Sequence, residues 1–308
     1  MSVSRNSYKK IQNVRDSFEV RWEQNTIVNI GQKHIALFRK AADGSSTNNL
    51  AVVELPPYPA RFCNFCDLEK AGQFESEASK KKFYVHLKTG TPTTLDLAAS
   101  QKESLLSEQK SAVDVLREID ELCYEAMWKS PAVLKKKKDT IKRALKKNGA
   151  TGDELERMAF EMFKDQGQSG VVLADDDTHD IKTKMAAYRR VRGDDGATEG
   201  FEPRKPQLVH RDVDGVTKQV DFKGFGGDTT VNRGALIAAH VRIKPYVTPN
   251  GAYGTTLTYV GGQMICNGPA MGSSLEYSSY DYLGSSASSA SSASFASPPP
   301  LKRAKTEC

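Results

Sequence analysis

The feature that most constrains the fold of this chain is a pair of long alternating segments between residues 235 and 266. ALIAAHVRIKPYV predicts a strand, PNG a turn and AYGTTLTYVGGQMIC a partner strand. Val241 and Ile243 share the face that we expect to enter the core. The opposite face gathers cationic side chains and one tyrosine ring, namely His240, Arg242, Lys244 and Tyr246. Because an isolated hairpin is only marginally stable, this one predicts a larger β-rich domain around it.

A second segment, KKKFYVHLK at residues 80–88, repeats this design. One face is apolar, and the other carries Lys82, Tyr84, His86 and Lys88. A protein that binds an unpaired strand without reading its sequence needs cations for the phosphates and rings on which bases stack, each ring contributing about 1–3 kcal/mol. An ordinary solvated sheet face is the alternative for one such strand, but two of them favour binding.

Further strands and an inserted helical region complete the expected domain. DSFEVRW, KHIALFRK and LAVVEL predict strands, the last of them ended by PPYP, and Asp214-Gly215 predicts a hairpin turn within residues 208–220. Apolar residues spaced three and four apart predict helices over residues 101–167. The second of these helices is expected to begin at Ser130-Pro131, and the third near Thr151 or Asp153.

The second helix is strongly basic. Residues 129–147 contain nine Lys or Arg residues and the single acid Asp139, a density that repels itself unless an anion is bound. A solvated helix face is the alternative, but the dominance of one sign favours an outer contact with phosphates. The residues expected to make this contact are Lys136, Lys137, Lys142 and Arg143. A further cluster follows the acidic run 175–177 and contains Lys182, Lys184, Arg189, Arg190 and Arg192.

The hairpin also carries a resemblance to a known family. A basic-aromatic strand leads through a turn into a Tyr-Gly element and a long apolar strand that ends near Gln. In this order, VRIKPYVTPNGAYGTTLTYVGGQMI resembles the closing strands of single-stranded DNA-binding proteins of phages and large DNA viruses. The residues that carry the likeness are Tyr246, Tyr253, Gly254, Leu257, Tyr259 and Gln263. The resemblance implies an OB-fold, which is a five-stranded Greek-key barrel. Many proteins of this family end in an acidic tail, and this chain does not.

Signals for an enzyme or a metal site are weak. Cys63-Asn64-Phe65-Cys66 supplies two of the four ligands that zinc needs, and the sequence contains no second CxxC. We therefore expect Cys63 and Cys66 to be reduced thiols, and we expect neither a bound metal nor a cofactor. The sequence contains no GxSxG or HExxH motif, so we predict that the protein is not an enzyme. It also contains no secretory signal and no apolar run long enough to span a membrane.

The composition changes at about residue 272. SSASSASSASFASPPP cannot build a core, so residues 272–308 are expected to be a disordered tail after a folded domain of residues 1–271. The tail ends in PPPLKRAKTEC, where Lys302, Arg303 and Lys305 resemble a short nuclear import signal. An additional electrostatic anchor for nucleic acid is the alternative. The first interpretation places the protein in the nucleus, or in the host nucleus if the source is viral.

Together these features predict an α+β protein. We expect an OB-fold-like antiparallel β-barrel with a helical insertion at about residues 101–167 and a disordered C-terminal tail. Its expected activity is the non-catalytic coating of single-stranded DNA in replication, recombination or repair, with replication or repair proteins and an import receptor as further partners. An RNA- or duplex-binding module, a metal-dependent nuclease and a virion structural protein are the alternatives. The residues expected on the sheet face are Lys82, Tyr84, Lys88, Arg242, Lys244, Tyr246 and Tyr259.

Overall fold

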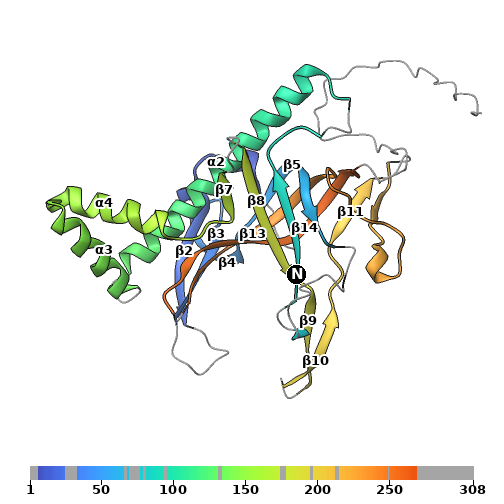
Figure 1. The fold of residues 1–308 in the computed structure, drawn as a ribbon. Coiled ribbons are helices and arrows are strands. Elements are labelled where there is room, and N and C mark those ends of the chain that lie inside the picture. Colours follow the sequence, from blue (N-terminus) through green and yellow to red (C-terminus); the bar gives the residue numbers. More distant parts are fainter. Residues whose placement is uncertain are drawn as a thin grey trace, which may run out of the picture.

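The structure of the chain is a computed structural model of α+β class (Figure 1). It describes residues 6–24, 33–65, 68, 77–78, 81–92, 96–130, 134–173, 178–194, 197–211, 215–248 and 250–268. The strands are β1 (Asn6–Ser7), β2 (Phe18–Gln24), β3 (Lys33–Lys40), β4 (Ser46–Leu50), β5 (Val52–Cys63), β6 (Lys82–Lys88), β7 (Val171–Leu173), β8 (His179–Ala186), β9 (Tyr188–Arg192), β10 (Thr198–Pro203), β11 (Leu208–Arg211), β12 (Thr217–Gln219), β13 (Leu236–Val247) and β14 (Tyr253–Cys266). The helices are α1 (Val14–Ser17), α2 (Ala99–Lys129), α3 (Lys135–Lys147) and α4 (Gly152–Asp165), together with the short 3-10 helices η1 (Tyr8–Lys10) and η3 (Lys223–Phe225).

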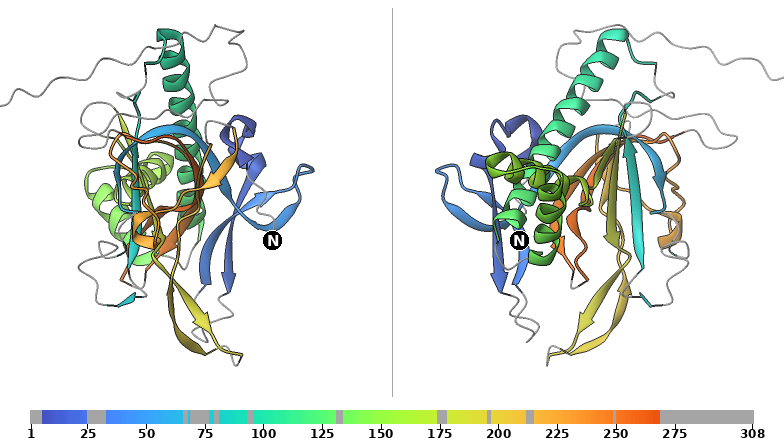
Figure 2. Two further views of the ribbon diagram at one scale, coloured as in Figure 1. Left: turned by 90° about the vertical axis from the view of Figure 1, so that its right-hand side faces the viewer. Right: turned by 60° about the vertical axis from the view of Figure 1, so that its left-hand side comes forward.

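Five strands of the main sheet form a closed ring. β5 pairs with β6, β6 with β8, β14 with β13, and β13 with β5, all antiparallel. The ring is closed by a short parallel pairing of β14 with β8, in which Leu257 lies opposite Thr183 and Thr258 opposite Lys184. The left view of Figure 2 shows these strands curving round one another. This pairing is consistent with the OB-like barrel that the sequence predicts.

The interior of the ring follows the period-2 pattern of the strands. Phe83, Val85 and Leu87 of β6 are fully buried, and the residues between them are half-exposed, as predicted. Val241 and Ile243 of β13 are also buried, which confirms the core face of that strand. Phe65, which follows β5, packs edge-on against rings from β6, β14 and residue 222. The side chains between these buried positions therefore point to the outer surface of the ring.

The predicted strand LAVVEL is wrong at both ends, and at its start Leu50 belongs to β4 while β5 begins at Val52. PPYP does not end this strand, because β5 continues through it to Cys63. The pairing explains why prolines are tolerated here. The ladder between β5 and β6 begins only at Ala60, and the ladder between β5 and β13 is irregular between Ala238 and His240. The missing N–H groups of the prolines therefore remove few hydrogen bonds, as is usual near a bulge.

The three predicted helices are confirmed between β6 and β7. α2 packs on the sheet with its apolar stripe, and α3 and α4 form a helical hairpin beside its C-terminal end (Figure 1). α3 begins at Lys135 and not at Ser130-Pro131. The ammonium group of Lys138 turns back and donates to the carbonyls of Trp128 and Ser130, at 2.8 and 2.6 Å. Burial, followed by the charge of Lys142, lowers the pKa of Lys138 to about 8. One member of the lysine run thus caps α2 and is not available to a ligand.

A buried carboxylate joins α2 to the ring. Asp120 is 7% exposed, and it accepts hydrogen bonds from the hydroxyl groups of Ser169 and Thr255. Within the described residues it forms no salt bridge. Burial raises the pKa of the Asp120 carboxyl, although both hydrogen bonds act in the opposite direction. The charged form of Asp120 is therefore less favourable in the folded protein than in the unfolded chain.

We expect Asp120→Asn to raise the melting temperature at pH 7 by about 2–4 °C, the shift that about 1 kcal/mol produces in a domain of this size. Because the pKa of Asp120 is higher in the folded than in the unfolded chain, its contribution to stability is complete below the unfolded pKa. That contribution is lost as the pH rises through the folded pKa. The amide does not ionise, so the gain should vanish below the unfolded pKa, at about pH 3. Thermal unfolding at both pH values checks this, with the exposed Asp114→Asn as control. A melting temperature lowered equally at both pH values contradicts it.

Candidate nucleic-acid interface

Four strands of the ring each place one outward side chain in a single row. Tyr84 of β6 lies opposite Lys184 of β8, Lys184 lies opposite Thr258 of β14, and Thr258 lies opposite Arg242 of β13. All four side chains are half-buried. Because paired strands lie about 4.8 Å apart, the row spans about 14 Å across the outer surface. We call Tyr84, Lys184, Thr258 and Arg242 the central row.

Two further lysines flank the central row. Burial lowers the pKa of the Lys184 ammonium group, and the charges of Lys82 and Lys244 lower it further. The ammonium group of Lys184 therefore lies close enough to be repelled by each of the two flanking lysines. Among the described residues, none of these lysines has an acidic partner within ion-pair distance. An anion bound between them would relieve this repulsion, which is the electrostatic property of a phosphate site.

Arg242 has a cationic neighbour on its other side. Burial lowers the pKa of the Arg242 guanidinium, and the charge of Arg204 lowers it further. Arg204 follows β10 directly, and its backbone N–H donates to the carbonyl of Ala187, at 2.7 Å. No acid within the described residues forms a salt bridge with either guanidinium. The cationic surface thus continues from β8 across β14 to β13 and then to the base of β10.

Three rings lie side by side next to the central row. The centroid of His86 is 6.2 Å from that of Tyr84 and 5.7 Å from that of Phe62. Phe62 of β5 is 48% exposed. Burial, with a further contribution from Lys182, lowers the pKa of His86, so the imidazole is uncharged at neutral pH. The surface therefore offers one exposed and two half-buried rings beside a cationic strip, and rings beside cations are what stacking of unpaired bases requires.

The structure brings together four of the seven residues predicted for the sheet face, namely Lys82, Tyr84, Arg242 and Lys244. Lys88 lies opposite Asp180, six residues along β6 from Lys82 and therefore about 20 Å from it. Tyr246 is half-buried at the far end of β13, where its hydroxyl donates to the side chain of Gln168. These two residues lie on the predicted face but outside the central row.

The prediction for Tyr259 is wrong. Its side chain is 1% exposed, and its ring packs against Phe65 with centroids 4.8 Å apart. Its hydroxyl donates to the carbonyl of Gln207, at 3.1 Å. Because Leu257 and Tyr259 are two residues apart, they share the inward face of β14. Tyr259 therefore stabilises the core and cannot stack on a base.

The Tyr-Gly element of the family resemblance is also structural. Tyr253 is 2% exposed and stacks on Phe163 of α4, with centroids 4.3 Å apart. Gly254 lies against the backbone of Gln168, and a Cβ atom at this position would come within 2.1 Å of the Gln168 carbonyl oxygen. Glycine is therefore needed here to let the two segments approach. This part of the motif fixes the helical hairpin to the ring and presents nothing to a ligand.

Some cationic side chains of the basic helix α3 contact other parts of the protein, and others are exposed. Lys137 lies over the ring of Tyr253, with its ammonium nitrogen 5.5 Å from the centroid. Lys142 forms an ion pair with Glu156 of α4 at 2.5 Å. Lys136 and Arg143 are exposed. Of the four residues predicted to contact phosphates, two thus have partners within the protein and two remain open to solvent.

Sequence reasoning missed or did not select several residues of this surface. Lys182 and Lys184 were predicted only as part of a charge cluster, although Ile181, Thr183 and Met185 alternate with them as a strand requires. Phe62 gave no signal, because a register shift between Ala60 and Phe62 interrupts the alternation of β5. Thr258 and Arg204 join the surface only through pairing that is distant in sequence.

Some predictions fall on residues that the structure does not describe. Cys66, the acidic run 175–177 and the whole tail from residue 269, with Lys302, Arg303 and Lys305, lie outside the described residues. Cys63 is described and half-exposed. The described residues contain no group of three or more side chains that could hold a metal ion. None of the described helices is both long enough and apolar enough to cross a membrane.

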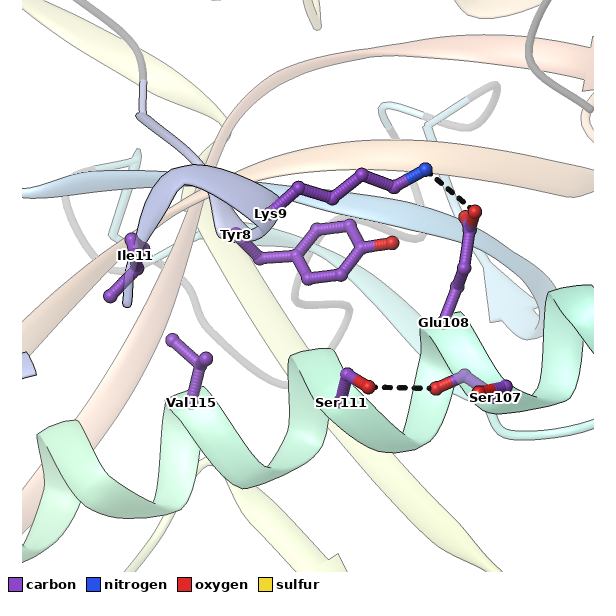
Figure 3. Close-up of a pocket in the computed structure, with 7 residues that line it drawn as sticks. All are labelled: Tyr8, Lys9, Ile11, Ser107, Glu108, Ser111 and Val115. Atoms are coloured by element: carbon purple, nitrogen blue, oxygen red, sulfur yellow. Dashed lines mark hydrogen bonds and ion pairs between the residues drawn. The ribbon is translucent and has the colours of Figure 1, made fainter. Parts of the chain in front are cut away.

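A surface pocket of about 380 Å³ lies elsewhere, between η1 and α2 (Figure 3). Lys9 reaches across it to form an ion pair with Glu108, at 2.6 Å. Ser111 donates to the carbonyl of Ser107 within α2, at 3.0 Å. These interactions are directed within the protein, so the pocket shows none of the converging cations and rings found on the ring surface.

Comparison with known proteins gives little further information. No protein-family model matches the chain, and no curated protein matches it. Among solved structures, the chain is similar to the crystal structure of gp2.5, a single-stranded DNA-binding protein encoded by bacteriophage T7, with a TM-score of 0.41 and 11% sequence identity. The match covers 74% of this chain and 98% of that one. A TM-score this low does not establish a shared fold.

Proposed function

We propose that this protein coats single-stranded DNA without catalysis, using the outer surface of an OB-type ring. The observation that supports this most directly is the central row with its flanking lysines. Lys184 is flanked by the charges of Lys82 and Lys244, and these groups and the Arg242 guanidinium have no acidic partners among the described residues. The exposed ring of Phe62 and the half-buried rings of His86 and Tyr84 lie beside them. Cations neutralise phosphates and rings stack on bases, and both interactions tolerate any sequence.

The rings and the cations occupy different β-strands, which indicates where the bases and the backbone of the bound DNA would lie. The rings of Phe62, His86 and Tyr84 belong to β5 and β6, and the cations belong chiefly to β8 and β13. We therefore place the bases over β5 and β6 and the sugar–phosphate backbone over β8, β14 and β13. Lys136 and Arg143 of α3 would act as outer phosphate contacts. A role in DNA replication, recombination or repair, and import into a nucleus through Lys302, Arg303 and Lys305, belong to the same proposal.

The test is a salt-titrated binding curve to oligo-dT, compared with a duplex and an RNA of equal length. We expect single-stranded DNA to bind at least tenfold more tightly than the duplex. The logarithm of affinity should fall against the logarithm of salt concentration with a slope of about −3, since each phosphate contact by Lys82, Lys184, Arg242 and Lys244 contributes about −0.7.

Each alternative function gives a different result in the same experiment. Equal binding of RNA or duplex assigns the protein to another class of nucleic acid. Loss of intact oligonucleotide after addition of magnesium identifies a nuclease. No binding of any oligonucleotide at moderate salt favours a structural role, and it overturns the proposal.

A further inference from the structure

A two-stranded ribbon formed by β9 and β10 leaves the ring where β8 ends. Figures 1 and 2 show it projecting from the body of the protein, and neither strand pairs with the main sheet. Between β8, which pairs in the main sheet, and β9, which pairs with β10, lies Ala187, and this residue is fully buried. The N–H group of Ala187 donates to the carbonyl of Lys81, at 3.0 Å, and its carbonyl accepts from the N–H group of Arg204, at 2.7 Å. These two hydrogen bonds therefore fix the base of the ribbon to the end of the ring strand β8.

The ribbon begins one residue after β8, at a bend on Ala187. Side chains alternate along a strand, so residues two apart share a face. In β9 these are Tyr188, Arg190 and Arg192, of which Tyr188 packs partly buried against the core at the base of the ribbon. In the ribbon, Phe201 lies opposite Arg190, and Thr198 lies opposite Arg192. We call Arg190, Arg192 and Phe201 the ribbon face.

The two faces of the ribbon differ in charge. On the opposite face Arg189 is neutralised by Glu202, with Nη2 and Oε2 2.6 Å apart. On the ribbon face, neither Arg190 nor Arg192 forms a salt bridge with a described residue. The guanidinium of Arg190 lies 6.0 Å from the centroid of Phe201, whose side chain is 39% exposed. The ribbon face thus repeats the combination of cation and open ring found beside the central row.

We propose that the ribbon face binds the single strand after it leaves the ring, so that the ribbon extends the DNA footprint beyond the barrel. This inference rests on the proposed function, and it adds a second contact region to that function. Lys184 and Arg192 are eight positions apart across the bend at Ala187, so their separation is at most about 26 Å. Single-strand sites of OB-folds vary from about 4 to 16 nucleotides, so a projection of this length accommodates several more. A strand held by the central row reaches the ribbon face only if it is long enough.

The experiment therefore compares a short and a long oligo-dT, of about 8 and about 24 nucleotides, at one salt concentration. We expect Arg190→Gln to weaken binding of the long oligonucleotide about fivefold and to leave binding of the short one unchanged. Phe201→Ser should have a similar effect without altering charge. The matched control is Arg189→Gln, the adjacent arginine on the opposite face, which should change neither affinity by more than about twofold. Circular dichroism confirms that each variant is folded.

The outcomes separate this inference from the proposed function. If the unmodified protein binds neither oligonucleotide, the proposed function fails and the ribbon contact fails with it. If it binds both, and Arg190→Gln and Phe201→Ser leave the affinity for the long one unchanged, only the ribbon contact is overturned. The ribbon contact is also overturned if the variants weaken binding solely to an oligonucleotide that carries a duplex end, because the ribbon would then contact paired DNA.

Discussion

The double substitution Lys184→Glu and Arg242→Glu is expected to weaken oligo-dT binding more than a hundredfold near physiological salt. Both residues belong to the central row and are half-buried on the outer surface of the ring. Each substitution removes a phosphate contact and adds a charge that repels phosphate, so the two losses reinforce each other. Fluorescence anisotropy measures the loss. The slope against salt should become shallower by about 1.4, which is two contacts at about 0.7 each.

The control for this prediction carries the same change in charge at another place. Lys102→Glu and Lys110→Glu alter α2, which is not one of the four strands that carry the central row. This variant should keep the salt dependence of the unmodified protein and lose less than about threefold in affinity. Equal losses in the two variants would mean that net charge, and not the central row, determines binding.

Tyr84→Ala should weaken binding about tenfold, and the factor should be the same at low and at high salt. The ring of Tyr84 lies beside His86 and opposite Lys184 on the outer surface. Stacking on a base contributes about 1–3 kcal/mol and releases no counterions, so salt does not alter it. Binding isotherms at two salt concentrations check this result.

Tyr84→Phe is the matched control, since it keeps the ring and removes the hydroxyl. It should bind within about twofold of the unmodified protein. A loss for Tyr84→Ala that disappears at low salt would show that the residue acts through the neighbouring lysines and not by stacking.

The regular parts of this fold could be predicted because they repeat. The alternation in β6 and β13 sorted Phe83 and Ile243 to the interior and Lys82 and Lys244 to the exterior, and the structure confirms this. The same holds for α2, where Leu105, Val113 and Leu116 recur at helical spacing and are buried. Such patterns reflect which face of one element meets the core, and they need no knowledge of its neighbours.

The parts that failed depend on contacts between distant segments. The prediction for Tyr259 failed because the burial of its ring depends on Phe65, which follows β5 and is distant in sequence. The roles of Lys137 and Lys142 depend on Tyr253 and Glu156, so a run of like charges could not show which members have partners. The central row itself needs the pairing of β14 with β8, and no local pattern reveals a pairing between residues 183 and 257.

That pairing has a mechanical consequence. Only two residue pairs join β8 directly to β14, whereas the other joins in the ring have three or more, and residues 168–170 bridge the two strands beside this seam. A nucleic acid that contacts Lys184 on one side of this seam and Arg242 on the other would span the shortest direct join of the ring and hold its two strands together. Binding would then stabilise the closed ring, and the ring without bound nucleic acid would be the form that opens first at this seam.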